Sequence, residues 1–192
     1  MVGSGGETGV AISLLPTESA QPAPRIRRFS RTKRLHAPID AFDRATLRII
    51  EELQRDGTLS AQQLAERVGL SATPVWRRVK ELEQSGVLRC RVALMDREKL
   101  GLTICVLAHV SLVRQTEGAV DDFERFALAR PEIMECARIT GEADYVIKVV
   151  VADMKAYDRF LSEQVFRLPG VASIRSNVVL REVKYETALP AG

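Results

Sequence analysis

The chain has 192 residues, of which 46% are apolar, with a formal net charge of +3 and a mean hydropathy of −0.04. This length suits one large domain or two small ones, and no apolar run approaches the length that spans a bilayer. The only histidines are His36 and His109, and the cysteines (Cys90, Cys105, Cys136) form no C-x-x-C pair. We therefore expect no metal site, no catalytic triad, no cofactor and no membrane partner, but reduced thiols in a cytosolic protein, two of them in strands.

Residues 1–37 are rich in Gly, Ser, Pro and Arg and carry six Lys/Arg against two Glu, which predicts a disordered basic tail. The segment PRIRRFSRTKRLH could hold a phosphate backbone without sequence preference. The simpler interpretation is a solvated tail, or an extension from a wrongly chosen start codon. Residues 38–192 have nearly balanced charges, so binding to a polyanion must come from the tail or from a local patch.

A first helix is predicted over residues 40–57. Asp40 suits the N-cap, Asp43 adds a carboxylate in the first turn, and Gly57 ends the helix. An apolar stripe follows the helical period through Phe42, Leu47, Ile50 and Leu53.

Two shorter helices follow. Ser60 and Gln63 have the spacing of a capping box, and Gly69 ends a helix of about two turns. Ser71 then caps a helix that runs to about Gln84, with Pro74 in its first turn, where the missing N–H is not needed. A short helix, a tight turn and a helix with basic residues near its start are typical of a helix-turn-helix.

In a helix-turn-helix the second helix enters the major groove of DNA, and its early residues face bases and phosphates. Arg77 and Arg78 suit these contacts, and Ser71 and Thr73 are short donors beside them. The predicted core of the three helices consists of Leu64, Val68, Val75, Val79 and Leu82. The alternative is an ordinary amphipathic helix with a solvated charged face.

The rest of the chain reads as an extended segment followed by β-α-β-β-α-β. The expected extended segment covers 87–96, the strands cover 102–113, 132–140, 145–152 and 171–185, and the helices cover 117–130 and 153–168. Val120, Phe123 and Ala127 should share one side of the first helix. This order is the ferredoxin-like fold, whose helices cover one sheet face, so we expect a second subunit to cover the other.

Several stretches, among them IDAFDRATLRIIEELQRDG, LAERVGLSATPVWRRVKELEQSGVL and RITGEADYVIKVVVADMKAYDRFL, resemble the Lrp/AsnC family of bacterial transcription regulators. The resemblance runs from about residue 38 to the end. It implies an α+β chain with an N-terminal, winged or plain, helix-turn-helix and a C-terminal ferredoxin-like βαββαβ domain. The basic tail 1–37 falls outside the resemblance. The parts that follow it are the DNA-binding domain 38–88, a linking strand and hinge 89–100, the sensing and oligomerisation domain 101–187, and a C-terminal tail 188–192.

The resemblance also implies functional residues. The recognition helix would be 72–84, and its candidate DNA contacts are Ser71, Thr73, Val75, Trp76, Arg77, Arg78 and Lys80. Trp76 departs from the expected pattern, and could pack on the linking strand or wedge against the sugar-phosphate backbone.

The effector position implied by the resemblance is the turn TGEAD. Asp144 would face the ammonium group of an amino acid, Gly141 would let the backbone approach its carboxylate, Thr140 would add a hydroxyl and Tyr145 a wall. Gly and Asp are also the default residues of any hairpin turn.

These features predict a cytoplasmic, nucleoid-associated regulator that binds double-stranded DNA and an amino acid or related small molecule, as a homodimer that assembles to an octamer. One alternative is an enzyme resembling the sirohaem decarboxylases, which use the same scaffold, although mid-strand His109 suits a structural role better. The other is a nucleoid-like architectural protein that wraps DNA.

Overall fold

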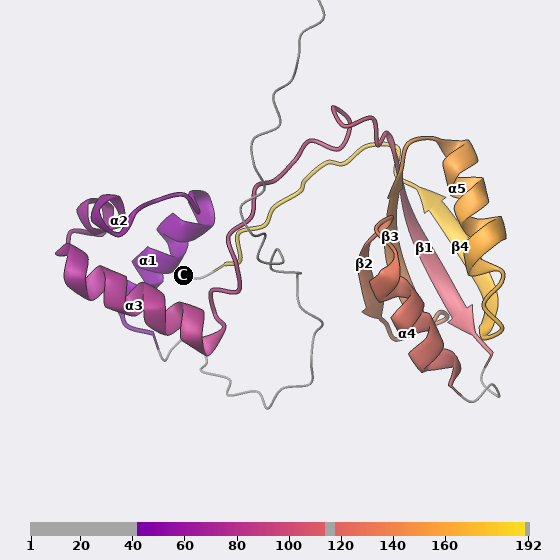
Figure 1. The fold of residues 1–192 in the computed structure, drawn as a ribbon, viewed down its shortest axis with the longest axis horizontal. Helices are drawn as coiled ribbons and strands as arrows, with labels where there is room; N and C mark the ends of the chain where they lie inside the picture. Colours follow the sequence, from indigo (N-terminus) through magenta and orange to yellow (C-terminus); the bar gives the residue numbers. More distant parts are fainter. Residues whose placement is uncertain (1–41, 114–117, 191–192) are drawn as a thin grey trace, which may run out of the picture. The chain divides into compact units, whose positions relative to one another are not determined.

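The computed structural model describes residues 42–113 and 118–190, and the predicted basic tail lies outside this part of the chain. Three helices come first: α1 (Arg44–Arg55), α2 (Ala61–Val68) and α3 (Ala72–Ser85). The strands and helices of the second group follow from residue 104 (Figure 1). The two groups fall within the predicted ranges 38–88 and 101–187, whose exact boundaries stay predictions.

The three helices enclose a core of their own. Its buried members include all five predicted residues, together with others from α1, α2 and the loop between them: Ile49, Leu53, Leu59, Leu64, Ala65, Val68, Val75, Val79 and Leu82. In α1 the buried stripe passes through Thr46, Ile49 and Leu53, whereas Leu47 and Ile50 are only half-buried. The buried stripe of α1 is therefore shifted by about one residue around the helix from the predicted apolar stripe.

The ends of α1 also differ from the prediction. Asp43, not Asp40, is the N-cap, because the Asp43 side chain accepts a hydrogen bond from the Thr46 backbone N–H at 2.8 Å. The helix ends at Arg55 with Asp56 as its extended C-cap, so Gly57 does not end it. Asp56 instead accepts hydrogen bonds from the backbone and hydroxyl of Thr58 and so shapes the turn that follows.

The capping residues of α2 are confirmed. Ser60 and Gln63 form both hydrogen bonds of a capping box, and Gly69 is left-handed with a φ of 72°. Ser71 occupies the N-cap position of α3, as predicted, but its side chain makes no capping hydrogen bond. Pro74 lies in the first turn and Gly86 is the left-handed C-cap.

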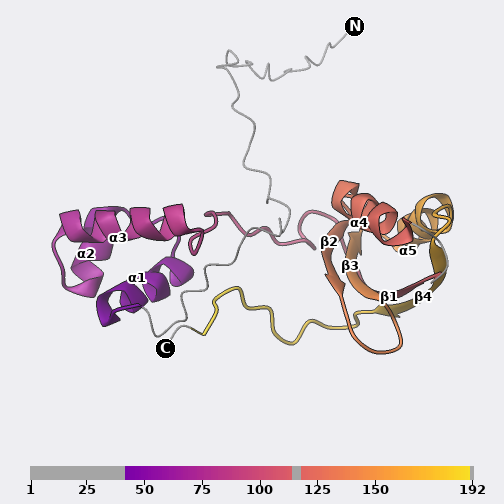
Figure 2. The ribbon, with the colours of Figure 1, turned by 90° about the horizontal axis from the view of Figure 1, so that it is seen from below.

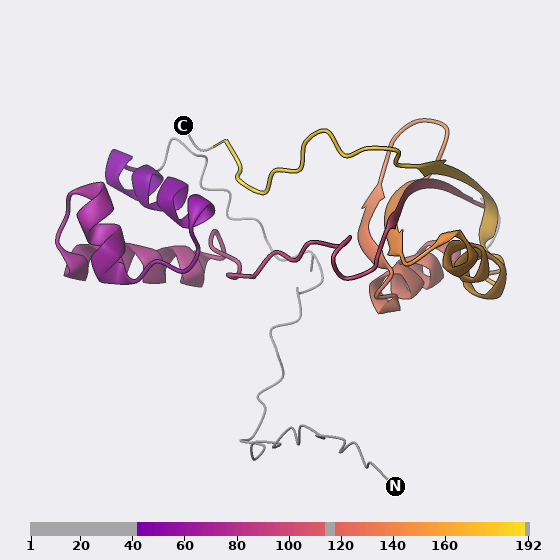
Figure 3. The same cartoon turned by 90° about the horizontal axis from the view of Figure 1, so that it is seen from above.

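The second group is a four-stranded antiparallel sheet with two helices. In chain order its elements are β1 (Ile104–Leu112), α4 (Ala119–Ala129), β2 (Ile133–Arg138), β3 (Tyr145–Val151), α5 (Met154–Phe160) with its continuation η2 (Leu161–Val165), and β4 (Val171–Val178). The strand order is β2-β3-β1-β4, so the predicted ferredoxin-like order is confirmed. Figures 2 and 3 show α4 and α5 on the same face of the sheet.

Alternate residues of β1 and β3 bury a core beneath these helices. Val106, Val110, Ile147 and Val149 are fully buried there, together with Phe123 of α4. Val120 is 37% exposed, so it does not share the buried side of α4 with Phe123 and Ala127 as predicted. The helical phase places Ala119 there instead.

Two predicted extended segments form no regular strand within residues 42–113 and 118–190. Residues 89–96 have no ladder partner, and the last strand ends at Val178 rather than at residue 185. Both segments expose apolar side chains, including Val92, Met95, Leu180 and Val183. Within the same described ranges, none of the helices combines the length and the apolarity that crossing a bilayer requires.

Candidate functional site

The outer surface of α3 presents polar and basic side chains. Ser71, Thr73, Arg77 and Lys80 are exposed, and they follow one another along the start and middle of the helix. The Arg77 side chain is 68% exposed and its Nε lies 3.7 Å from Glu81 Oε1. A solvated ion pair of this kind is weak, so a phosphate or a base could replace the carboxylate at little cost.

Arg78 has a different environment from Arg77. Its guanidinium lies 2.8 Å from Asp43 Oδ2 and donates to Thr46 Oγ1 at 3.4 Å, and the side chain is 24% exposed. Arg78 therefore joins α3 to the first turn of α1. This structural role competes with the DNA contact predicted for it.

Val75 is the other candidate that the structure corrects. The residue is completely buried in the core of the three helices. It was predicted both as a core residue and as a DNA contact, and only the first role is compatible with its position.

Trp76 lies beside the exposed cationic residues of α3. It is 56% exposed and lines a shallow pocket of about 210 Å³ with Leu64, Lys80 and, from the linking segment, Arg91. Lys80 Nζ pairs with Glu83 Oε2 at 2.8 Å. The large exposed area leaves the indole able to reach a nucleic acid backbone.

The predicted effector turn connects β2 to β3. Gly141 has a φ of 120°, a conformation that other residues rarely adopt, and Thr140 and Gly141 are exposed. The backbone of Asp144 is fixed from both sides, because its N–H donates to Val110 and its carbonyl accepts from Ile139. These two hydrogen bonds tie the Asp144 end of the turn to Val110 of β1 and to Ile139, which follows β2.

Asp144 and Tyr145 are engaged inside the domain. One carboxylate oxygen of Asp144 accepts from the Leu112 backbone N–H at 2.8 Å, which leaves the other for a ligand. Tyr145 is 2% exposed and packs 4.9 Å from the Phe123 ring, so it belongs to the core and does not form a wall of the turn. Burial and the hydrogen bond that its hydroxyl donates to Glu124 at 2.7 Å raise the pKa of Tyr145 above its usual range.

Two charged residues at the turn were missed by the sequence analysis. Glu142 Oε2 lies 3.3 Å from Arg175 Nη1, and both side chains are largely exposed. Arg175 is on β4, opposite His109 of β1. Only the strand register brings Arg175 to this turn, so the sequence carried no signal for it.

His109 and the three cysteines are the remaining residues that the sequence singled out. The His109 ring Nδ1 lies 3.3 Å from Asn177 Nδ2, which fits the structural role expected for it. The three cysteines are free, and Cys105 and Cys136 lie in β1 and β2 as predicted.

Comparison with known proteins identifies both parts of the chain. A family described as winged helix-turn-helix DNA-binding matches residues 42–89, and one described as the Lrp/AsnC ligand binding domain matches residues 105–189. The Bkd operon transcriptional regulator of Pseudomonas aeruginosa is 40% identical over 149 residues, which cover 78% of this chain and 97% of that protein. The chain belongs to the Lrp/AsnC family.

Two further comparisons support the assignment of this chain to the Lrp/AsnC family. The leucine-responsive regulatory protein of Escherichia coli is 41% identical over 151 residues, which cover 77% of this chain and 90% of that protein. A Neisseria meningitidis transcriptional regulator, solved as a complex with L-Met, has a TM-score of 0.75 and 35% identity, and the match covers 78% of this chain and 96% of that one. This chain is accordingly a DNA-binding transcription regulator with a ligand-binding domain, and the relatives give no support to the architectural protein or to the decarboxylase.

Proposed function

We propose that this Lrp/AsnC protein is a sequence-specific regulator whose DNA binding is modulated by an amino acid or a related small molecule. The observation that carries the proposal is the exposed basic face of α3, on a helix whose apolar face is fixed in a core. The side chains that would contact DNA are Ser71, Thr73, Trp76, Arg77 and Lys80. Arg77 would read a base edge or a phosphate, and Lys80 would contact a phosphate.

The effector would bind at the turn between β2 and β3. An amino acid needs a carboxylate for its ammonium group and a cation or N–H groups for its carboxylate. Glu142 and the free oxygen of Asp144 suit the first requirement, and Arg175 and the backbone at Gly141 suit the second. The L-Met complex of the Neisseria meningitidis relative supports this class of ligand.

The regulator would act in the cytoplasm, on the nucleoid, as a dimer that assembles further, up to an octamer. Support comes from the sheet, which has both helices on one face (Figure 2) and the 39% exposed Leu107 on the other. A dimer presents two recognition helices to half-sites about one helical turn apart, and a larger assembly adds avidity. The effector would favour one assembly or domain placement over another.

We also propose that the chain is not an enzyme. Its relatives are named as transcription regulators, and the one histidine of the sheet domain, His109, is held by Asn177.

DNA binding can be tested with the full chain and fragments of its own promoter region. We expect Arg77→Ala to weaken specific binding by about ten- to a hundredfold, the cost of one good side-chain contact with a base. Gln84→Ala, an exposed change near the end of the same helix, is the control and should bind as the wild type does. Fluorescence polarisation measures both, and circular dichroism checks the fold. An affinity for the promoter fragment, and a preference for it over random DNA, that both stay as in the wild type after Arg77→Ala would contradict this assignment.

Binding of an amino-acid effector can be tested separately from DNA binding. A thermal-denaturation screen of the twenty amino acids should find a concentration-dependent rise in melting temperature for at least one of them, as mass action requires. Glu142→Gln and Arg175→Ala should each reduce that rise. The idea fails if no amino acid stabilises the protein and none changes its affinity for the promoter.

A further inference from the structure

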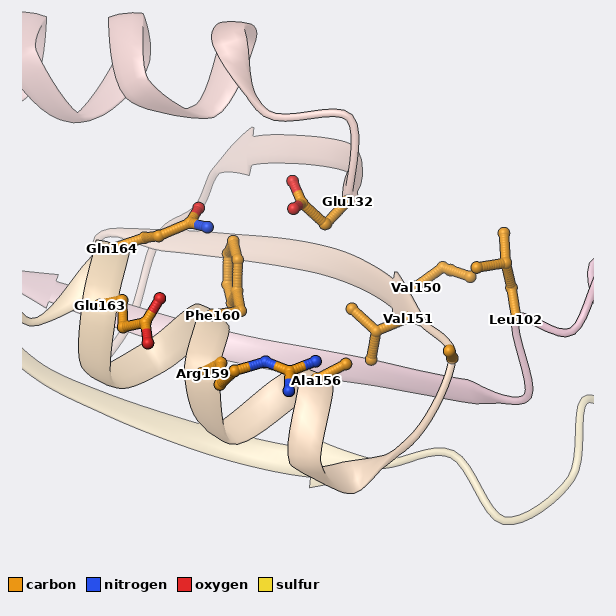
Figure 4. Close-up of a pocket in the computed structure, with 10 residues that line it drawn as sticks. Leu102, Glu132, Val150, Val151, Ala156, Arg159, Phe160, Glu163 and Gln164 are labelled. Carbon is orange, nitrogen blue, oxygen red and sulfur yellow. The ribbon is translucent and has the colours of Figure 1, made fainter.

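A pocket of about 280 Å³ opens at the other end of the sheet from the effector turn. It lies among the end of β3, the residue before β2, and the helix formed by α5 and η2 (Figure 4). Leu102, Val150 and Phe160 supply apolar surface, whereas Glu132, Gln164 and Arg159 supply polar groups. Small-ligand sites combine an apolar wall with a few placed polar groups in this way.

The polar groups of the pocket include two buried acceptors without donors. Glu132 Oε2 and Gln164 Oε1 are buried, and neither has a hydrogen-bond partner within residues 42–113 and 118–190. Figure 4 shows the side chains of Glu132 and Gln164 directed toward the space above the Phe160 ring from opposite sides. A buried acceptor left without a donor is costly, so a donor from outside the chain would be bound favourably.

The backbone at the pocket is also unusual. Gln164 belongs to η2, a π-helical turn closed by a hydrogen bond from the Phe166 backbone N–H to the Leu161 carbonyl at 2.9 Å. Single π-helical turns inside α-helices occur frequently at functional sites. Here the wider turn continues α5 and carries the Gln164 side chain to the pocket.

The charge of Glu132 indicates which class of ligand this pocket would bind. Glu132 forms no ion pair with a cation of the described residues, so its carboxylate favours a cationic donor. An ammonium group has three N–H donors and no acceptor, and so can satisfy two acceptors at once. Arg159 also lines the pocket, on the side of Phe160 away from Glu132 in Figure 4, where it could meet a carboxylate on the same molecule.

We propose that this pocket binds a small aliphatic molecule through a protonated primary amine, with the ammonium group donating to Glu132 and Gln164 and the alkyl part lying on Val150 and Phe160. The molecule is either a simple amine or an amino acid, and the two differ in whether Arg159 takes part. This site is separate from the effector turn, and it does not depend on the proposal made for that turn.

Three related probes test the proposal on the full chain: L-norleucine, n-pentylamine, which is norleucine without its carboxylate, and hexanoate, which is norleucine without its amino group. We expect saturable binding of n-pentylamine, measured by calorimetry and by the rise in melting temperature, and no binding of hexanoate here. Glu132→Gln keeps the side-chain size and removes the charge, and should weaken amine binding by about ten- to a hundredfold. Asp158→Asn, an exposed change on α5 outside the pocket, is the matched control and should bind the amine as the wild type does.

The probes also distinguish the two sources of the amine. If norleucine binds more tightly than pentylamine, and Arg159→Ala removes that difference, the ligand is an amino acid; if norleucine binds more weakly, it is a simple amine. The proposal is overturned if hexanoate binds as well as the amine, if Glu132→Gln leaves amine affinity unchanged, or if neither amine saturates below about 10 mM. Circular dichroism of each variant confirms folding, and DNA affinity through Arg77 gives an independent measure of the proposed regulatory function.

Discussion

Arg77 and Arg78 are neighbours in the chain with different roles in the structure. Each residue of an α-helix is turned by about 100° from the previous one, so adjacent side chains leave in different directions. Arg77 points to solvent, where it can meet DNA, whereas Arg78 points to Asp43 at the start of α1. A double substitution at these positions would weaken the contact between α3 and the start of α1 together with the DNA contact. Arg77 is therefore the residue whose substitution isolates the contact.

The Asp43 carboxylate should make the stability of α1 and its contact with α3 depend on pH. Hydrogen bonds from the Thr46 hydroxyl and backbone N–H, followed by the Arg78 charge, lower the pKa of Asp43 in the folded protein. A lowered folded pKa adds stability that is present above the unfolded pKa of about 3.9 and is lost as the pH falls through the folded pKa. We expect Asp43→Asn to lower the melting temperature at neutral pH, by a difference that shrinks to nothing in acid. A difference that is constant over the range would show that the charge is not involved.

The helix caps show how local sequence determines each helix of the three-helix group α1 to α3, which is called the head below. Ser60 and Gln63 satisfy two backbone N–H groups of α2 reciprocally, whereas Ser71 occupies the same position of α3 without a side-chain bond. The sequence signal, a serine before a helix, is the same at both places. The difference arises because Pro74 takes the third position of α3, where the capping box needs a backbone N–H.

This contrast predicts unequal costs for the same substitution. Ser60→Ala should destabilise the head by about 1 kcal/mol, and Ser71→Ala by much less. Trp76, the single tryptophan, lies in the head, so its fluorescence during urea denaturation reports the unfolding of this part. Equal losses in the two variants would contradict the assigned roles.

Gly170 controls the fit between the start of β4 and the start of α4. A Cβ atom at Gly170 would lie 2.6 Å from Ala119 Cβ and 3.0 Å from Ala119 Cα, so backbone would have to move. We expect Gly170→Ala to cost about 1–3 kcal/mol, the usual range for overpacking. Gly57→Ala, whose added Cβ meets nothing closer than 3.9 Å, is the comparison. Thermal denaturation followed by circular dichroism measures both, and similar midpoints would show that α4 moves freely.

At the scale of the whole molecule, a single chain leaves much apolar surface uncovered. Leu180 is 96% exposed, Val183 84% and Val92 64%, all in extended segments without a ladder partner in the described residues. The sheet also has helices on only one face (Figure 2). Exposed apolar groups of this kind mark interaction surfaces, and they are available to the assembly proposed above.

Assembly through the open face of the sheet can be tested at Leu107. Leu107→Lys places a charge on the face of β1 away from the helices and should convert dimers to monomers at micromolar concentration, as read by light scattering after gel filtration. Leu128→Lys, 58% exposed on α4, should leave the dimer intact. A dimer that survives the first change would exclude the sheet as the interface.

The element order, the capping box of α2, the core of the three helices and the exposed face of α3 were all predictable from the sequence. Each depends on neighbours within a few positions, where helical period, capping and turn chemistry act directly. The missed start of α1 and the shifted apolar stripe are errors of one to three residues. Asp40 and Asp43 have the same side chain and suit a cap equally, so the sequence does not choose between them, and only the packed structure shows that the buried stripe of α1 runs through Thr46, Ile49 and Leu53.

By itself, then, the sequence determined a three-helix head with a basic recognition helix and a ferredoxin-like domain, because these follow from local periodicity and from motifs in a known order. Tertiary structure alone decided which residues meet. It placed Arg78 against Asp43, Arg175 beside Glu142, Tyr145 in the core, and Glu132 opposite Gln164. Partners separated by about thirty positions are joined by strand register and helix packing, and these depend on the burial of the whole core rather than on any local run of residues.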